Sequence, residues 1–271
     1  MQNKIISLSE LKQIQLDILI KVHDFCVKNG IKYFLSYGTL IGAIRHKGYI
    51  PWDDDIDIEM TRPNYDRFIK TFNGAFHNLE VYAPELNRNY YAPYANVCDT
   101  RTILKENGIN HNGCCLGVKI DIFPIDGLPS DTRIYNKMYK KARLYNSLLV
   151  YNQRKFSQCF NGALSYQMEH CLKWAIAHII PHSLIQKWIC NLATSYDYNT
   201  SPKAGLISFT PIKYPIEKKY FDDYIKVEFE GKFFYTIKDY DLYLRHIYGD
   251  YLELPPIEER VPHHNFHASW K

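Results

Sequence analysis

The chain has 271 residues, of which 33 are Lys or Arg and 29 are Asp or Glu, so its formal net charge is +4. This length fits one large domain or a domain with an appended subdomain. The positive excess is too small to indicate nucleic-acid binding. The seven cysteines, an odd number without C-x-x-C spacing, argue against a zinc site.

No targeting or membrane-spanning segment is predicted. The first residues lack the apolar core of a signal peptide, and no apolar run reaches the roughly 18 residues that a spanning helix needs. The longest candidate, residues 174–180, ends at Pro181. We expect a cytoplasmic protein with reduced thiols, with peripheral contact at the inner face of the cell membrane as a further option.

The chain opens with a predicted helix, a strand and a second helix. Ser7 and Glu10 form a capping box, and apolar residues then recur at helical spacing until Gly30 ends the helix. Residues 31–36 are predicted as a strand. A turn at the next two residues leads into a short helix over 39–46.

Four carboxylates follow within five positions, at Asp53, Asp54, Asp55 and Asp57. Residues 55–60 alternate polar and apolar side chains, which is the pattern of a half-buried strand. In an extended chain Asp53, Asp55 and Asp57 would share one face, about 7 Å apart at each step. Asp54 would point the other way, and the apolar positions would face the core.

This acidic cluster predicts a bound divalent cation, because like charges so close together raise one another's pKa. Mg²⁺ takes oxygen ligands, commonly carboxylates together with substrate phosphates. Upstream, Gly38 permits close approach of a ligand to the backbone, and the helix that follows offers its N-terminus to a phosphate. Arg45, His46 and Lys47 add cationic groups nearby.

Other interpretations of these motifs are possible. Acidic runs are commonly solvated loops, but this one lies within an apolar alternation behind a Gly-Thr turn. An EF-hand loop counted from Asp53 would place Ile58 at the turn glycine and Asn64 at the bidentate Glu, so that class of site is excluded. For residues 45–47, a solvated helix end remains as open as a phosphate site.

Downstream, Pro63 starts a helix, residues 79–99 and 118–123 are predicted as strands, and residues 107–117 as a loop that could hang over the site. Later, a hairpin is predicted over 226–236 and a helix over 240–248. The terminal tail holds three histidines, for which a flexible or packing role is favoured over metal binding: His263, His264 and His267.

Residues 132–196 are predicted to be helical and rich in basic side chains. The basic residues of the first helix are Lys137, Lys140, Lys141 and Arg143, and two more lysines stand beside tryptophans at Lys173–Trp174 and Lys187–Trp188. A solvated face is one interpretation. Docking on a membrane surface that presents a lipid-linked glycan acceptor is the other.

Three segments resemble motifs of the LicD family, which includes bacterial phosphocholine transferases and, more distantly, fukutin and fukutin-related protein. They are GTLIGAIRHKGYIPWDDDIDIEM (38–60), VKIDIFPIDGL (118–128) and YLRHIYGDYLELPPIEER (243–260). The resemblance implies a nucleotidyltransferase-like fold. It also implies transfer of a phospho-alcohol from CDP-choline or another CDP-alcohol to a sugar hydroxyl.

The resemblance also implies roles for single residues. Gly38 and Thr39 match the phosphate-binding turn, to which Arg45 and Lys47 would add donor contacts. Asp55 and Asp57 match the metal-binding D-x-D pair. Asp53 would be a further metal contact, and Asp121, the candidate third acid, would also contact the metal. Tyr37, where many relatives have Gly, would narrow the nucleotide pocket or stack in it.

We therefore predict an α+β fold in which a nucleotidyltransferase-like core with a mixed sheet (1–128) carries a helical region (129–200) and a C-terminal segment that returns to the core (201–271). The reaction would be phosphoryl transfer dependent on Mg²⁺ or Mn²⁺. Phosphocholine would pass to a cell-surface glycan precursor of lipopolysaccharide, teichoic acid or capsule, with release of CMP.

Asp121 is the favoured base for the acceptor hydroxyl, and His46 a weaker one. The alternatives are a nucleotidyltransferase proper and a non-catalytic sugar- or nucleotide-binding module.

Overall fold

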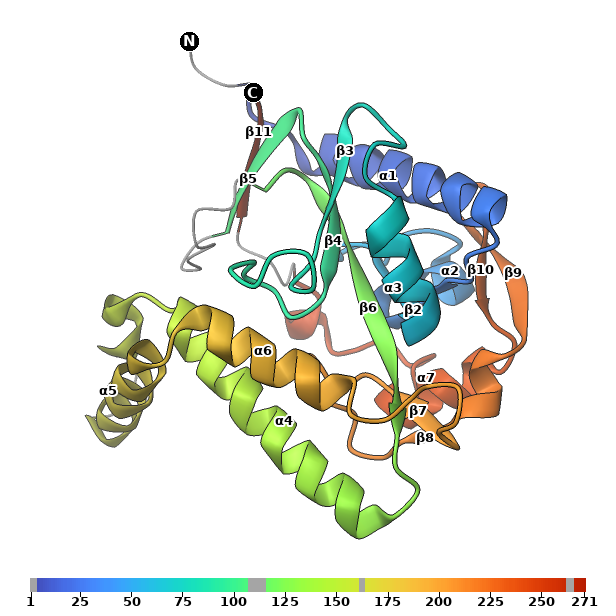
Figure 1. Cartoon of the computed structure of the whole chain (residues 1–271). Coiled ribbons are helices and arrows are strands. Elements are labelled where there is room, and N and C mark those ends of the chain that lie inside the picture. Colours follow the sequence, from blue (N-terminus) through green and yellow to red (C-terminus); the bar gives the residue numbers. More distant parts are fainter. Residues whose placement is uncertain (1–3, 107–115, 161–163, 262–265) are drawn as a thin grey trace.

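The computed structural model describes residues 4–106, 116–160, 164–261 and 266–271. Its centre is a mixed sheet with the strand order β1-β2-β6-β4-β3 (Figure 1). β2 and β6 are parallel neighbours, and the other pairs are antiparallel. The strands are β1 Phe34–Leu35, β2 Asp57–Thr61, β3 Leu79–Tyr82, β4 Ala95–Asp99 and β6 Lys119–Leu128. The predicted α+β fold is confirmed.

β6 is longer than the predicted strand 118–123 and serves two parts of the sheet. Its first half pairs with β2 and β4, and its second half pairs with β7 (Lys203–Gly205). β7 in turn pairs with β8 (Ile216–Glu217). The C-terminal part of the chain thus contributes strands to the same sheet as the acidic strand β2.

α1 (Leu8–Asn29) lies across the sheet and contacts β4 and β6. Its N-terminus is capped as predicted, because the Ser7 hydroxyl accepts a hydrogen bond from the Glu10 N–H at 3.2 Å. Gly30 closes the helix with φ 62°, a left-handed conformation that favours glycine. α3 (Arg62–Thr71) carries proline in its first turn and contacts β2 and β6.

Two strand predictions need correction. The strand predicted over 31–36 is only β1, because the chain turns at once into α2 (Tyr37–His46). The span 79–99 is two antiparallel strands, β3 and β4, separated by residues 83–94. Within that connection Tyr90 and Tyr91 are buried in a small cluster of their own.

The end of the chain is a strand rather than a tail. β11 (Phe266–Trp270) pairs antiparallel with β5 (Thr102–Glu106), so His267 lies in a strand, opposite Lys105. His263 and His264 lie outside the described residues, as do residues 107–115 of the predicted loop. The predicted hairpin is confirmed as β9 (Tyr224–Phe229) and β10 (Lys232–Ile237), and the last predicted helix as α7 (Tyr240–Tyr248).

The helical region consists of α4 (Thr132–Gln153), α5 (Leu164–Ile179) and α6 (His182–Ala193), with a 3-10 turn over Phe156–Phe160 between the first two. α4 packs against both α5 and α6, and the three lie to one side of the sheet (Figure 1). Within the described residues, none of the helices has both the length and the apolar character needed to span a membrane.

Candidate active site

Two carboxylates meet where the parallel strands β2 and β6 begin. The register of these strands places Asp57 directly beside Asp121. The Asp57 N–H donates to the hydroxyl of Thr39 at 2.8 Å, which ties the first turn of α2 to this end of β2. The apolar positions of the predicted strand face the core as expected, since Ile56, Ile58 and Met60 are fully buried.

The acids before Asp57 do not extend the strand, contrary to the prediction that it begins at Asp55. β2 starts at Asp57, and the preceding residues 53–56 form no regular structure. In this irregular segment, ligand oxygens of Asp53, Asp54 and Asp55 lie within 4.8 Å of one another. Asp54 therefore joins the cluster instead of facing away. It is buried and does not line the adjoining cavity, whereas Asp53, Asp55 and Asp57 do.

The electrostatics of the cluster favour a cation. Burial, reinforced by neighbouring Asp55, raises the pKa of Asp53 to about 8. Burial also raises the pKa of Asp57 well above its ordinary value, with Asp55, Asp121 and Asp53 adding to the effect and Lys119 opposing it. Clustered carboxylate oxygens whose charges repel are the donor set that a hard divalent cation takes. The residues present fit Mg²⁺ or Mn²⁺.

Asp121 differs from the other acids because a cation of the chain itself faces it. Its carboxylate accepts hydrogen bonds from Lys119 Nζ at 2.8 Å and from the Asn96 amide. Burial raises the pKa of Asp121, and Lys119 opposes that shift. Lys119 also lies 3.8 Å from a carboxylate oxygen of Glu106. Held between these donors, Asp121 has a fixed orientation next to Asp57.

The two residues of the predicted phosphate-binding turn, Gly38 and Thr39, have different places in the structure. Gly38 lines the cavity, and a Cβ at this position would lie 2.6 Å from Oδ2 of Asp53, so only glycine fits without a shift. Thr39 is 3% exposed, and its hydroxyl accepts the Asp57 N–H. In this structure Thr39 therefore positions Asp57, and it does not line the cavities described below.

Arg45 and Lys47 were predicted to contact the donor and His46 to be a weaker candidate for the base, and of these three the structure brings only Arg45 to the acidic cavity. Arg45 lines it and donates to the backbone carbonyls of Tyr251 and Glu253. His46 is half-buried, its ring accepts from Arg45 Nε at 2.9 Å, and burial lowers its pKa. Lys47 is exposed at the C-terminal cap of α2. His46 and Lys47 line none of the cavities around the acids.

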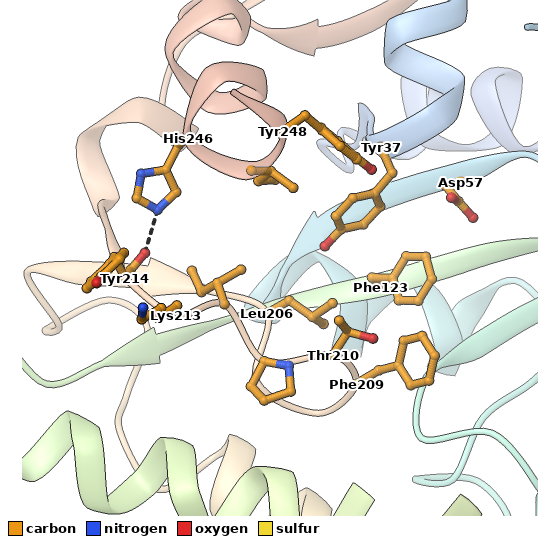
Figure 2. A pocket seen from close by; sticks show the side chains of 13 residues that line it. Tyr37, Asp57, Phe123, Leu206, Phe209, Thr210, Lys213, Tyr214, His246 and Tyr248 are labelled. Atoms are coloured by element: carbon orange, nitrogen blue, oxygen red, sulfur yellow. Dashed lines mark hydrogen bonds between the residues drawn. The ribbon is translucent and has the colours of Figure 1, made fainter. Parts of the chain in front are cut away.

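Three cavities surround the acids. The acidic cavity, about 730 Å³, is lined by Gly38 and by six carboxylates: Asp53, Asp55, Asp57, Asp250, Glu253 and Glu259. The aromatic cavity, about 460 Å³, is also bordered by Asp57 (Figure 2). Its rings belong to Tyr37, Phe123, Phe209, Tyr214, His246 and Tyr248. Asp57, Tyr37 and Tyr248 border both cavities.

The third, or polar, cavity measures about 390 Å³ and lies between the sheet and α4. Asp121 and Lys119 line it from β6, and Asn146 and Gln153 from α4. Oδ1 of Asn146 is buried and has no hydrogen-bond partner among the described residues. A buried amide oxygen left in this state favours a ligand that can donate to it.

Sequence reasoning missed several residues of the site. Glu59 is buried behind Asp57 and accepts hydrogen bonds from Tyr37 at 2.8 Å and from Tyr243 at 2.7 Å. Burial raises the pKa of Glu59 to about 7. The available signal was its place in the Asp-Ile-Asp-Ile-Glu alternation. Phe209, which borders both the aromatic and the polar cavity, comes from a segment without a motif.

Tyr37 lines both the acidic and the aromatic cavity. Its ring contacts Phe123 edge-on, with centroids 5.5 Å apart, and its hydroxyl is held by Glu59. The side chain therefore forms part of the wall between the acidic and aromatic cavities and narrows both.

Comparison with known proteins agrees with this arrangement. The family model "LicD/FKTN/FKRP, nucleotidyltransferase domain" matches residues 30–143. The lipopolysaccharide cholinephosphotransferase LicD of Haemophilus influenzae is 34% identical, over 96% of this chain and 97% of that protein. An uncharacterized protein of Rickettsia typhi is 52% identical over 19% of this chain and 17% of its own length. Mannosyltransferase regulator 4 of Saccharomyces cerevisiae is 28% identical over 52% of this chain but 12% of its own length. The chain belongs to the LicD family.

Proposed function

We propose that this LicD-type phosphotransferase moves phosphocholine from CDP-choline to a sugar hydroxyl of a cell-surface glycan precursor and releases CMP. The observation that carries the proposal is the pairing of Asp57 with Asp121 at the border of three cavities. A donor can then reach Asp57 through the acidic and aromatic cavities while an acceptor reaches the neighbouring Asp121 through the polar cavity. The relative from Haemophilus influenzae, similar along nearly its whole length, is a cholinephosphotransferase.

Asp53, Asp55 and Asp57 would hold the divalent cation, and Asp54 lies in the same cluster without facing the cavity. When bound, the cation neutralises charge on the diphosphate and on the departing CMP. Gly38 leaves room for the Asp53 carboxylate, with which any side chain there would collide, and a phosphate would approach both residues through the acidic cavity that they line. Arg45 adds the cationic group that an anionic donor needs at this wall.

The two cavities that share Asp57 suit the two ends of the donor. A quaternary ammonium is attracted to aromatic faces and to carboxylates, and the acidic cavity offers Trp52, Tyr248 and Tyr251 together with its acids. Cytosine is flat and uncharged, and it suits the aromatic cavity. There the rings of Phe123 and Phe209 are nearly parallel, with their centroids 6.1 Å apart. The diphosphate would then lie beside Asp57.

The acceptor would enter through the polar cavity. A sugar hydroxyl there lies beside Asp121, whose carboxylate takes its proton. The acceptor oxygen forms a bond to the phosphorus of the phosphocholine group. The bond from that phosphorus to the bridging oxygen breaks, and CMP leaves with that oxygen. Asn146 and Gln153 offer hydrogen-bonding groups to the sugar.

The test is incubation with CDP-choline, CDP-ethanolamine, CDP-glycerol and CDP-ribitol in Mg²⁺, with and without a lipopolysaccharide acceptor. We expect CMP release to be fastest with CDP-choline, to increase with acceptor, and to stop in EDTA. A nucleotide-labelled acceptor would instead identify a nucleotidyltransferase proper. Binding of donor without product would identify a non-catalytic module.

A further inference from the structure

α5 presents an apolar stripe that nothing in the described chain covers. Met168, Leu172, Ile176 and Ile179 recur at spacings of three and four residues, so they share one helix face. Their exposed fractions are 67%, 62%, 46% and 81%. Soluble helices normally bury such a stripe against a core, so its exposure marks an interaction surface.

The opposite face of α5 already has its partners. Ala177 is fully buried, and the His170 ring packs edge-on against Tyr151 of α4 at 5.7 Å between centroids. Trp174 is half-buried and donates from Nε1 to the Arg154 carbonyl at 2.9 Å. The tryptophans that the sequence suggested as surface anchors thus pack within the protein, since Trp188 also lies against Tyr145.

Basic side chains line the same side of the helical region. Lys137, Lys140 and Lys141 are exposed, and helical spacing places them on the face of α4 that later presents Tyr151 to α5. Residues 132–193 hold nine Lys or Arg and one acid, Glu169, a net charge of +8 where the whole chain has +4. The positive charge is therefore concentrated in this region.

This surface adjoins the polar cavity. Gln153, Arg154 and Gln158 line that cavity, and the 3-10 turn over Phe156–Phe160 connects them with α5. Phe156 packs on Trp174 of α5, with ring centroids 4.9 Å apart. A surface that seats α5 would consequently lie close to the cavity that receives the acceptor.

We propose that the α5 stripe (Met168, Leu172, Ile176, Ile179) and the α4 lysine row (Lys137, Lys140, Lys141) form one docking face for an anionic phospholipid surface. An amphipathic helix buries such a stripe at the level of the headgroups, and each nearby lysine is attracted by anionic lipids. A second copy of this chain is a poorer occupant, because a two-fold interface would bring the two basic faces together.

The test measures co-sedimentation of the full chain with phosphatidylcholine vesicles, with and without about one-third phosphatidylglycerol. We expect binding to the anionic vesicles alone, weakening as salt rises. Leu172→Gln with Ile176→Gln should weaken it at least about tenfold. Lys137→Gln, Lys140→Gln and Lys141→Gln together should do the same. All variants should keep the wild-type rate of CMP release from CDP-choline in water, as a check on folding.

Matched controls carry the same changes elsewhere on the surface. They are Val27→Gln with Leu86→Gln, and Lys28→Gln with Lys70→Gln and Lys232→Gln, all at exposed positions. These controls should bind vesicles like the wild type, and equal weakening by them would overturn the proposal. So would failure of the wild type to sediment with anionic vesicles. A wild-type dimer in light scattering that Leu172→Gln with Ile176→Gln converts to monomer, without vesicle binding, would assign the face to a second copy.

Discussion

At the scale of single residues, the acids of the cluster differ in what they touch. Asp57 borders both the acidic and the aromatic cavity, Asp55 borders the acidic one, and Asp54 borders neither although its carboxylate lies among the others. The cluster could be identified from the sequence, because four acids within five positions are apparent whatever structure the segment adopts. The sequence could not show that residues 53–56 are irregular, since Asp55 begins the polar and apolar alternation that predicted a strand.

These differences predict which Asp→Asn substitutions lower kcat most. Asp55→Asn and Asp57→Asn should each lower kcat at least about 100-fold, because each removes a charged ligand of the cation that stabilises the reacting phosphates. Asp54→Asn changes the same chemistry at a position that lines no cavity, and should be much milder. Steady-state CMP release measures the effect, and thermal unfolding checks that all three variants fold. Equal losses would make Asp54 a ligand of the cation.

The raised pKa of Asp53, about 8 against an ordinary 3.8, predicts how the cation and the pH interact. The folded chain holds a proton that the unfolded chain releases, so without metal the stability that Asp53 contributes is fully present below about pH 4 and is lost as the pH rises through about 8. A cation binds the carboxylate form and removes that loss. The increase in Tm caused by Mg²⁺ over EDTA should therefore be larger at pH 8 than at pH 6.

Calorimetry at pH 6, 7 and 8 measures this difference. The variant combining Asp55→Asn with Asp57→Asn is the control, and Mg²⁺ should leave its Tm nearly unchanged at each pH. An increase of the same size at pH 6 and pH 8 would show that Asp53 does not gain or lose a proton when the cation binds.

At the scale of elements, local patterns predicted helices well and strand pairing poorly. The capping box, the hairpin and α7 follow from nearby residues alone. β5 and β11 pair although they lie far apart in the chain, and no local pattern encodes such a partner. Proline and glycine are disfavoured inside strands, yet β6 continues through Pro124 and Gly127, and its second half pairs with β7. The acid Asp126 within it then gains a partner that the sequence could not indicate.

That partner is Arg62 of α3, which joins the helix to the sheet. Its Nε donates to Asp126 at 2.6 Å and its Nη1 to Glu85 at 3.0 Å, with Arg62 and Asp126 both buried. Removing one member of a buried pair leaves an uncompensated charge, so Arg62→Ala should lower the free energy of unfolding by about 3–5 kcal/mol. Arg67→Ala, on the exposed side of α3, is the control and should cost well under that. Denaturant titration measures both, and similar losses would show that the pair contributes little.

At the scale of the whole molecule, the acids stand where three parts of the chain meet. β2 and β6 supply Asp57 and Asp121, the segment 206–214 with α7 closes the aromatic cavity, and α4 closes the polar cavity. The sequence predicted the first part because its motif is continuous. It could not predict the cavities, because each combines residues from separate segments that carry no chemical pattern of their own.

This division predicts that donor and acceptor use can be separated by substitutions in α4. Asn146 lines the polar cavity and is distant in the chain from every residue of the acidic and aromatic cavities. Asn146→Ala removes an amide whose oxygen has no partner among the described residues. It should raise the KM for the glycan acceptor about five- to tenfold, the loss expected for one hydrogen bond. The KM for CDP-choline and the slow release of CMP to water should stay at wild-type values.

Asn136→Ala, at an exposed position of the same helix, is the matched control and should change neither constant. If Asn146→Ala instead raised the KM for the donor and left the acceptor unaffected, the polar cavity would belong to the nucleotide. Because Asp121 faces that cavity, its role would then shift from accepting the hydroxyl proton to holding the donor. The result therefore decides from which side of the paired carboxylates the acceptor hydroxyl approaches.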